Sequence, residues 1–249
     1  MSLRAHDVFK QVDIVAGYTT YLDLIRPLID GKETISTAMQ KEVDRVEAAL
    51  DAALAGKACA IVSSGDSGVY AMAGLVFEIC QIKKIALVPP GAKTPADSPQ
   101  PVLPIEVVPG IPALCAGAAM LGAPLTHDFA VISLSDLLTP WKVIEKRIQA
   151  AARADFVIVI YNPKSKKRDW QLEAAQKIIL EHRDSQTPVG IVTSAMRTKQ
   201  NVEIVPLDEL HQASVNMQTI VFIGNSSSAA YLDYMITPRG YTKKYKIDD

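Results

Sequence analysis

The sequence lacks several features that define common classes of protein. It has three cysteines among 249 residues and no C-x-x-C pair, so it carries neither a disulfide framework nor a cysteine metal motif. Its formal net charge is -1, which leaves no excess of one sign to recruit nucleic acid or an acidic membrane. No stretch approaches the ~18 apolar residues of a membrane span, and the start, MSLRAHDVFK, lacks the apolar run of a signal peptide. We therefore expect a soluble, cytoplasmic protein whose three cysteines are reduced core residues: Cys59, Cys80 and Cys115.

Short apolar runs alternate with helical patterns along the whole chain. Each run ends in glycine, proline or serine, which is typical of buried, mostly parallel strands. Between the runs, apolar residues recur at steps of three and four, which indicates amphipathic helices. The predicted strands are residues 12–18, 58–65, 84–90, 105–110, 128–136, 155–163, 188–195 and 219–225. The alternation predicts an α/β fold, with mainly parallel or mixed sheets flanked by helices.

Capping residues and helix breakers predict the limits of the longest helices. Ser36 and Thr37 are candidate N-caps of a helix that runs to about residue 55 and ends before Gly56. Thr139 is the candidate N-cap of a later helix, with Pro140 at its first position. A third helix is predicted from about residue 169 to 182.

Two stretches bear on domain organisation. Residues 89–104 are rich in proline, which favours a surface loop over regular structure. Near residues 121–129 a helix of small residues gives way to a new strand. We therefore expect two α/β domains, residues 1–122 and 123–249, with a ligand cleft between them.

The stretch SSGDSGVYAMAG, residues 63–74, contains the Gly-Asp-Ser-Gly run that surrounds the nucleophile of trypsin-like proteases. A nucleophilic Ser67 would need a base and a group to orient that base. The four histidines fall in predicted helices, at helix ends or in a loop, and the chain is not the β-barrel of such a protease. We interpret the stretch as a strand-to-helix turn.

Small residues follow four of the predicted strands, at residues 63–68, 109–113, 161–163 and 193–195. Ligands bind beyond the carboxyl ends of strands in an open α/β sheet, where small residues and backbone groups permit close approach. No G-x-G-x-x-G follows a strand and no G-x-x-x-x-G-K-[ST] is present. A nucleoside without phosphates therefore fits better than a dinucleotide or a nucleoside triphosphate.

Seven segments stand in a fixed order between residues 63 and 241, within a resemblance that covers the chain from about residue 4 to 241: SSGDSGVYAMAG, VVPGIPAL, GAPLTHDFAVISLSDLLTPW, IYNPKSKKR, GIVTSAMR, IGNSSS and ITPRGY. Together they resemble the tetrapyrrole methyltransferases of cobalamin biosynthesis. Each segment is a weak signal alone, but seven in order with matching spacing are specific. YNPKSKKR and SLSDLLTPW indicate the branch of the family that acts on C-17 of precorrin-3B or cobalt-factor III.

The resemblance implies a two-domain tetrapyrrole methylase fold, usually a homodimer, with S-adenosyl-L-methionine bound in the cleft. The reaction it implies transfers the sulfonium methyl group to C-17 of the tetrapyrrole and contracts the ring. Such a transfer depends mainly on holding donor and acceptor in line. The resemblance therefore implies no metal and no covalent nucleophile, and it assigns no catalytic residue.

Matching motif positions imply which residues contact the cofactor. The implied contacts are Ser64, Gly65, Asp66, Val69, Pro112, Ala113, Asn162 and Ala195. Two structural alternatives stay open, since Gly65 could serve only as a turn glycine and Asp66 only as a helix N-cap.

A group of cations follows the predicted strand 155–163, and another cation follows the strand 188–195. They are Lys164, Lys166, Lys167, Arg168 and Arg197. One interpretation is a solvated helix entry. The other is that they bind the propionate and acetate arms of the tetrapyrrole, because lysine and arginine pair well with carboxylates.

The chain departs from the family pattern in two places. Ser67 stands where the family has proline after Gly-Asp, which should leave the backbone donors of the turn in place. The family also opens with a strand and a Gly-x-Gly-Pro-Gly loop that lines the substrate trough, whereas the sequence begins near the helix at Arg4. We therefore expect the first strand of the fold to be missing and the trough to be incomplete.

Two alternatives to C-17 methylation remain from the sequence. One is another methyltransferase of the same fold, acting on a different ring carbon, on diphthine or on ribosomal RNA. The other is a protein that binds the cofactor but is catalytically impaired. YNPKSKKR argues against the first.

Overall fold

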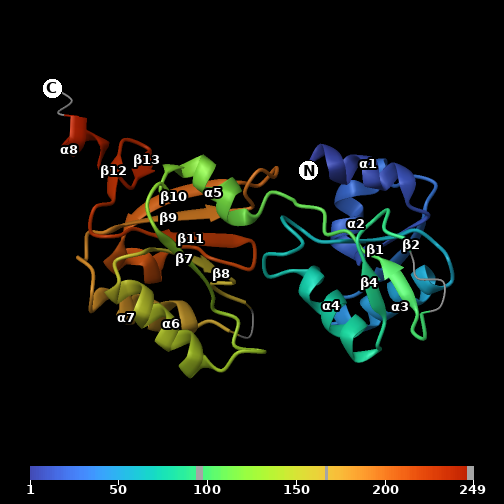
Figure 1. The fold of residues 1–249 in the computed structure, drawn as a ribbon. Coiled ribbons are helices and arrows are strands. Elements are labelled where there is room, and N and C mark those ends of the chain that lie inside the picture. The colour runs from blue at the N-terminus through green and yellow to red at the C-terminus, as the bar shows by residue number, and fades with distance from the viewer. Residues whose placement is uncertain (94–97, 166–167, 246–249) are drawn as a thin grey trace. The chain divides into compact units, whose positions relative to one another are not determined.

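The computed structural model describes residues 1–93, 98–165 and 168–245 (Figure 1). The chain divides into two compact units, Met1–Pro112 and Ala113–Asp249, which we describe separately. The division lies before the small-residue helix α5 (Ala113–Leu121), whereas the sequence placed it after that helix. The helix belongs to the second unit because Gly117 packs directly on Phe222. A Cβ at Gly117 would lie 2.8 Å from Cε2 of that ring.

A parallel sheet in the order β2-β1-β3 forms the centre of the first unit. The middle strand β1 (Ile14–Tyr18) is buried along its first four residues, as expected of a parallel strand covered on both faces. β2 (Glu33–Thr37) and β3 (Cys59–Val62) flank it. A separate parallel pair consists of β4 (Ala86–Val88) and β5 (Val102–Pro104). No strand links the two sheets in the described part of this unit.

Helices pack against these strands and complete the first unit. They are α1 (Leu3–Gln11), α2 (Thr19–Ile25), the 3-10 helix η1 (Arg26–Leu28), α3 (Glu42–Leu54) and α4 (Met72–Ile82). Val46 and Leu50 of α3 are buried with Ile79 and Cys80 of α4 in one apolar cluster. Burial of these side chains provides the main driving force for packing the two helices together.

Seven of the eight predicted apolar runs contain a strand, but two predictions in the first unit are wrong. Ser36 and Thr37 do not cap a helix, since they pair with β1 as the end of strand β2, and the helix α3 begins only at Glu42. Residues 105–110 form no strand, and their polar groups bind Arg4 of α1 and Asp66 of the turn after β3 instead. The strand β5 lies just before them, where Leu103 is buried.

The second unit contains a five-stranded mixed sheet in the order β10-β9-β11-β8-β7. Only β7 and β8 pair in parallel, and the other neighbours are antiparallel. Its strands are β7 (Phe129–Ser133), β8 (Val157–Tyr161), β9 (Pro188–Thr193), β10 (Asn201–Pro206) and β11 (Thr219–Ile223). Because β8 and β9 run in the same direction on either side of β11, their carboxyl ends meet at one edge of the sheet.

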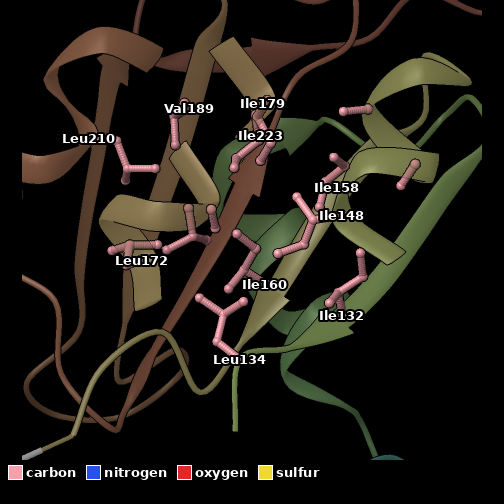
Figure 2. Close-up of a cluster of buried hydrophobic side chains, with 14 of the residues drawn as sticks. Ile132, Leu134, Ile148, Ile158, Ile160, Leu172, Ile179, Val189, Leu210 and Ile223 are labelled. Atoms are coloured by element: carbon pink, nitrogen blue, oxygen red, sulfur yellow. The ribbon is translucent and has the colours of Figure 1, made fainter. Parts of the chain in front are cut away.

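Successive residues of the central strands point to opposite faces, as the pleat of a strand requires. Ile158 and Ile160 of β8 enter one apolar cluster with the helices α6 (Trp141–Arg153) and α7 (Gln171–Leu180) (Figure 2). The intervening Val159 enters another cluster with α5. Helices therefore cover both faces of this sheet.

The remaining elements of the second unit include a small sheet in the order β12-β13-β6. They are β6 (Gly122–Ala123), the 3-10 helix η2 (Leu207–Gln212), β12 (Ala229–Tyr231), β13 (Tyr234–Ile236) and α8 (Tyr241–Tyr245). The predicted capping of α6 is wrong, since Pro140 itself occupies the N-cap position and no side chain caps the helix. None of the described helices has the length and apolar character needed to cross a membrane.

Candidate functional site

Both oxygens of the Asp66 carboxylate hold the glycine-rich turn that follows β3. Oδ1 accepts the backbone N–H of Gly68 at 2.8 Å, and Oδ2 accepts the backbone N–H of Gly110 at 2.8 Å. Gly110 approaches so closely that a Cβ on it would lie 1.9 Å from the carbonyl oxygen of Gly65. Gly65 itself has a left-handed φ of 79°, which glycine adopts without strain. Asp66 thus fastens the turn to the segment that precedes α5.

The structure excludes the helix-cap interpretation of Asp66. Asp66 does not cap α4, because that helix begins at Met72 and no side chain caps it. The Ser67 hydroxyl donates to the backbone carbonyl of Val108 at 3.3 Å, which gives it a role in packing. Gly65 is exposed, so the turn presents its backbone to solvent.

The second unit has three non-glycine residues with left-handed backbone at the edge where β8 and β9 end. They are Asn162 at φ 51°, Ser194 at φ 53° and Met196 at φ 57°. Left-handed backbone is uncommon for residues with a side chain, asparagine being the most tolerant, and residues in sparsely populated conformations cluster at functional sites. This edge is therefore the candidate ligand site of the second unit.

The beginning of α5 lies at the same edge. The hydroxyl of Tyr161, the last residue of β8, accepts the backbone N–H of Leu114 at 2.9 Å. Ala113, the first residue of α5, packs with Tyr161 against the same apolar cluster. Ala195 lies between the two left-handed residues Ser194 and Met196.

The predicted cofactor residues thus form two groups, one in each unit. Ser64, Gly65, Asp66 and Val69 lie together in the turn after β3, and Pro112 ends the first unit. Ala113, Asn162 and Ala195 belong to the carboxyl edge of the second unit.

A hydrogen-bonded network joins the loops after β7 and β8. The hydroxyl of Ser133 accepts from the Asn162 side-chain amide at 3.0 Å and from the backbone N–H of Ser135 at 3.2 Å. The carboxylate of Asp136 accepts from Gln171 Nε2 at 2.8 Å. The segments SLSDLLTPW and YNPKSKKR are therefore one structural feature, since they meet at the ends of adjacent parallel strands.

The cations of the predicted cluster differ in how far they are buried. Lys164 is exposed, as a contact to a carboxylate arm requires, and Arg197 is half-buried. Arg168 is only 8% exposed, and its Nη2 donates to the carbonyl oxygen of Asn162 at 2.9 Å. Burial lowers the pKa of the Arg168 guanidinium, while the charge of Asp136 opposes this shift. Arg168 therefore does not fit the predicted role of an exposed cation.

Lys166 and Lys167, which complete the predicted cluster, lie outside the described residues. Of the three cysteines, Cys80 is buried and Cys59 is half-buried, but Cys115 is exposed on α5, contrary to the expectation of a core residue. No group of three or more His, Cys, Asp or Glu side chains within residues 1–93, 98–165 and 168–245 could hold a metal ion.

Sequence reasoning assigned no contact to several residues that shape these sites, although Tyr161 and Ser194 lie in the strand-end ranges 161–163 and 193–195 that it singled out. Ser133, Tyr161 and Gln171 all make side-chain hydrogen bonds at the edge of the second unit, and Ser194 has strained backbone there. Their position directly after or beside predicted strands was a usable signal. The partners of these side chains were not predictable from the sequence, because each bond joins residues far apart in it.

Together these features define a two-unit α/β protein with glycine-rich and left-handed turns at strand ends. The chain belongs to the tetrapyrrole (corrin/porphyrin) methylases, the family whose profile matches residues 1–211. This confirms the family resemblance of the seven sequence segments.

Individual relatives agree with this assignment. The chain is 46% identical over 245 residues to "Cobalt-factor III methyltransferase" of Priestia megaterium, covering 98% of this chain but 43% of that protein. It is 42% identical to "Probable cobalt-factor III C(17)-methyltransferase" of Salmonella typhimurium, covering 97% and 94%. The crystal structure of the methyltransferase CobJ matches with a TM-score of 0.81 and 31% identity, covering 96% and 93%. The chain therefore spans less than half of the first relative and nearly all of the other two.

Proposed function

We propose that the protein is an S-adenosyl-L-methionine-dependent C-methyltransferase of cobalamin biosynthesis. It methylates C-17 of a tetrapyrrole, with contraction of the ring. The carbon–sulfur bond of the sulfonium methyl group breaks, a carbon–carbon bond forms at C-17, and S-adenosylhomocysteine is released. The observation that carries the proposal is the 42% identity to a probable C(17)-methyltransferase over nearly the whole length of both chains.

Cobalt-factor III is the proposed substrate, with precorrin-3B as the metal-free alternative. Relatives at 40–46% identity from bacteria and archaea are named for cobalt-factor III. The solved relative CobJ and the CobIJ proteins match at 31% and 38% identity. The relatives named for cobalt-factor III match at higher identity than CobJ and the CobIJ proteins do, which favours the cobalt-containing substrate.

The proposed role of the two strand-end groups is to bind and orient the cofactor, which supplies the methyl group when bound. In the first unit the proposed contacts are Ser64, Gly65, Asp66, Val69 and Pro112, and in the second Ala113, Asn162 and Ala195. Small side chains and left-handed turns support this role, because they expose backbone groups to a ligand. Holding the methyl group in line with its acceptor is itself a large part of catalysis.

The polyanionic substrate is proposed to meet exposed cations. Lys164 is exposed and follows the strand end that carries Asn162, which supports a contact with a carboxylate arm. We propose the same role for Lys166, Lys167 and Arg197.

A cofactor-binding protein without turnover is the competing function. Such a protein would keep both strand-end groups and bind the cofactor without transferring its methyl group. Calorimetry with S-adenosylhomocysteine does not separate it from an enzyme, but turnover does. A uroporphyrin-III C-methyl transferase of the same fold is complexed with S-adenosylhomocysteine, which recommends that compound as the binding probe.

We further propose a cytoplasmic homodimer with neither nucleic acid nor membrane as partner. The near-neutral net charge supports the absence of a nucleic-acid partner. Light scattering after size-exclusion chromatography measures the oligomeric state directly, and a monomer at all concentrations would contradict the dimer.

The decisive experiment is an anaerobic incubation with S-adenosyl-L-methionine and either cobalt-factor III or precorrin-3B, followed by mass spectrometry. We expect cobalt-factor III to gain one methyl group, and no gain when S-adenosylhomocysteine is present in excess. A gain on precorrin-3B alone would reverse the choice of substrate. Binding without any methyl gain would leave the binding protein as the function.

A further inference from the structure

Arg168 is a buried charged residue of the second unit. Its backbone exchanges two hydrogen bonds with that of Ser165, since each residue's N–H donates to the other's carbonyl, at 2.8 and 3.3 Å. The side chain returns beneath the end of β8, where Nη2 donates to the carbonyl of Asn162. Its Nε has no hydrogen-bond partner among the described residues. A guanidinium that is 8% exposed and incompletely paired is unfavourable for stability alone, which points to a functional reason for its position.

Asn162 is the residue that this guanidinium contacts, and its backbone conformation needs support. Its φ of 51° is left-handed, and its peptide carbonyl is the group that Arg168 binds. The side-chain amide is fixed separately by the hydroxyl of Ser133. Asn162 is therefore clamped from both sides at the point where β8 ends.

The clamp leaves part of Asn162 for a ligand. Within residues 1–93, 98–165 and 168–245, neither its backbone N–H nor its Oδ1 has a hydrogen-bond partner. These are one donor and one acceptor, a combination suited to a nucleoside or an amino-acid group. The side-chain Oδ1 would change its direction relative to β8 if Asn162 relaxed to a right-handed or extended conformation, because φ rotates the side chain about the N–Cα bond.

The charge that Arg168 brings is balanced locally. The carboxylate of Asp136 acts on it electrostatically, and the same carboxylate accepts from Gln171. This arrangement holds the guanidinium in place without directing it to solvent. A cation intended for a carboxylate arm of the substrate would instead be exposed, as Lys164 is.

We infer that Arg168 is a positioning residue for the cofactor site, which it serves by holding Asn162 in its left-handed conformation. The inference rests on the proposed function, because it gives Asn162 a contact with S-adenosyl-L-methionine. It replaces the predicted contact of Arg168 with the tetrapyrrole.

Calorimetry with S-adenosylhomocysteine on the full chain tests the inference in a double-mutant cycle. We expect Arg168→Met to weaken binding about tenfold, the effect of losing a hydrogen bond to a charged group. In an Asn162→Gly background the same change should weaken binding less than about threefold, because glycine adopts the left-handed conformation unaided. Equal losses in both backgrounds would show a merely structural role and overturn the inference.

Arg183→Met provides a matched control. The Arg183 side chain is 3% exposed and donates to backbone carbonyls at the opposite edge of the same sheet. Its loss should lower stability at least as much, because Arg183 also pairs with Asp155, and should leave the affinity for S-adenosylhomocysteine unchanged. If Arg168→Met does not fold, Arg168→Lys replaces it, and an affinity equal to that of the wild type would overturn the inference.

Two further readouts separate this inference from the proposed function. An unchanged affinity for S-adenosylhomocysteine with a raised KM for the tetrapyrrole would return Arg168 to the substrate. The amide resonance of Asn162 in a nitrogen–proton correlation spectrum needs no ligand, and we expect it to shift in Arg168→Met and not in Arg183→Met. An unchanged resonance would overturn the inference, whereas a wild type that binds no S-adenosylhomocysteine would overturn the proposed cofactor.

Discussion

Replacing Asp66 with alanine removes two hydrogen bonds at once, because its two oxygens accept from Gly68 and Gly110. A hydrogen bond to a charged group contributes about 1.5–3 kcal/mol, and the bond to Gly68 lies in an exposed turn where the lower figure applies. We therefore expect the first unit to lose about 3 kcal/mol of unfolding free energy, taking the partly buried Gly110 bond at a similar value. Asp66→Asn keeps one acceptor oxygen without the charge, so it should lose roughly half as much.

The binding effect of the same change follows from the position of the turn. Without Asp66 the segment around Gly110 is no longer fastened to the turn after β3. We expect affinity for S-adenosylhomocysteine to fall by about 1–3 kcal/mol, or roughly 5- to 150-fold in calorimetry.

Asp184→Ala is the matched control for stability. Its Oδ1 accepts from the N–H two residues on, Gln186, at 2.8 Å, as Asp66 does from Gly68, but no side-chain bond to a second loop is found for it in the described part of the chain. The difference between the two variants therefore isolates the bond to Gly110. If Asp66→Ala matched Asp184→Ala in both unfolding and affinity, the structural and the cofactor roles of Asp66 would both be refuted.

The two tryptophans supply a probe of where the damage occurs. Trp141 and Trp170 both lie in the second unit, so their fluorescence reports that unit, while far-ultraviolet circular dichroism reports the whole chain. In urea, Asp66→Ala should shift the dichroism transition more than the fluorescence transition. Gly110→Ala should behave similarly, because its Cβ would lie 1.9 Å from the carbonyl oxygen of Gly65.

Two other predictions concern titrating groups. Exposed Cys115 should react with iodoacetamide at pH 8 much faster than Cys59. Burial, aided by the charge of Glu33, raises the pKa of Cys59 to about 11, so little of its reactive thiolate is present at that pH. Peptide mapping that finds equal rates for the two cysteines would contradict this prediction. Burial raises the pKa of Asp155, but hydrogen bonds from Ser226 and the charge of Arg183 outweigh it and hold the pKa below its usual range. The stabilisation is therefore complete above about pH 4 and is lost as pH falls through the folded value. Asp155→Asn should lower the urea midpoint at pH 7 and have less effect at pH 3, and an equal effect at both would count against it.

Strand prediction succeeded where burial is dictated by local composition. The runs that became β1, β8, β9 and β11 are continuous and apolar, and the structure buries all or nearly all of their residues. The run at residues 105–110 looks similar in sequence, yet it forms no strand. Its Glu106 pairs with Arg4 and its Gly110 binds Asp66, two partners that are distant in the sequence.

Helix limits were less predictable because capping residues compete with strand pairing. Ser36 and Thr37 are good N-caps in isolation, but they extend β2 in register with Gly17 and Tyr18. The hydrogen bonds of a parallel ladder outweighed the local preference. The sequence contains no local signal of that partner strand.

The sequence by itself determined the α/β class, the family and the turns at strand ends, because apolar periodicity and the order of the seven segments are local properties of the chain. Only the tertiary structure decided what individual polar residues do there. Asp66 proved to fasten two loops rather than cap a helix, and Arg168 proved to be buried beneath Asn162 rather than exposed to solvent. The physical reason is that the sequence determines a side chain's charge and hydrogen-bonding groups. Its partners and its exposure to water depend on residues that folding brings beside it.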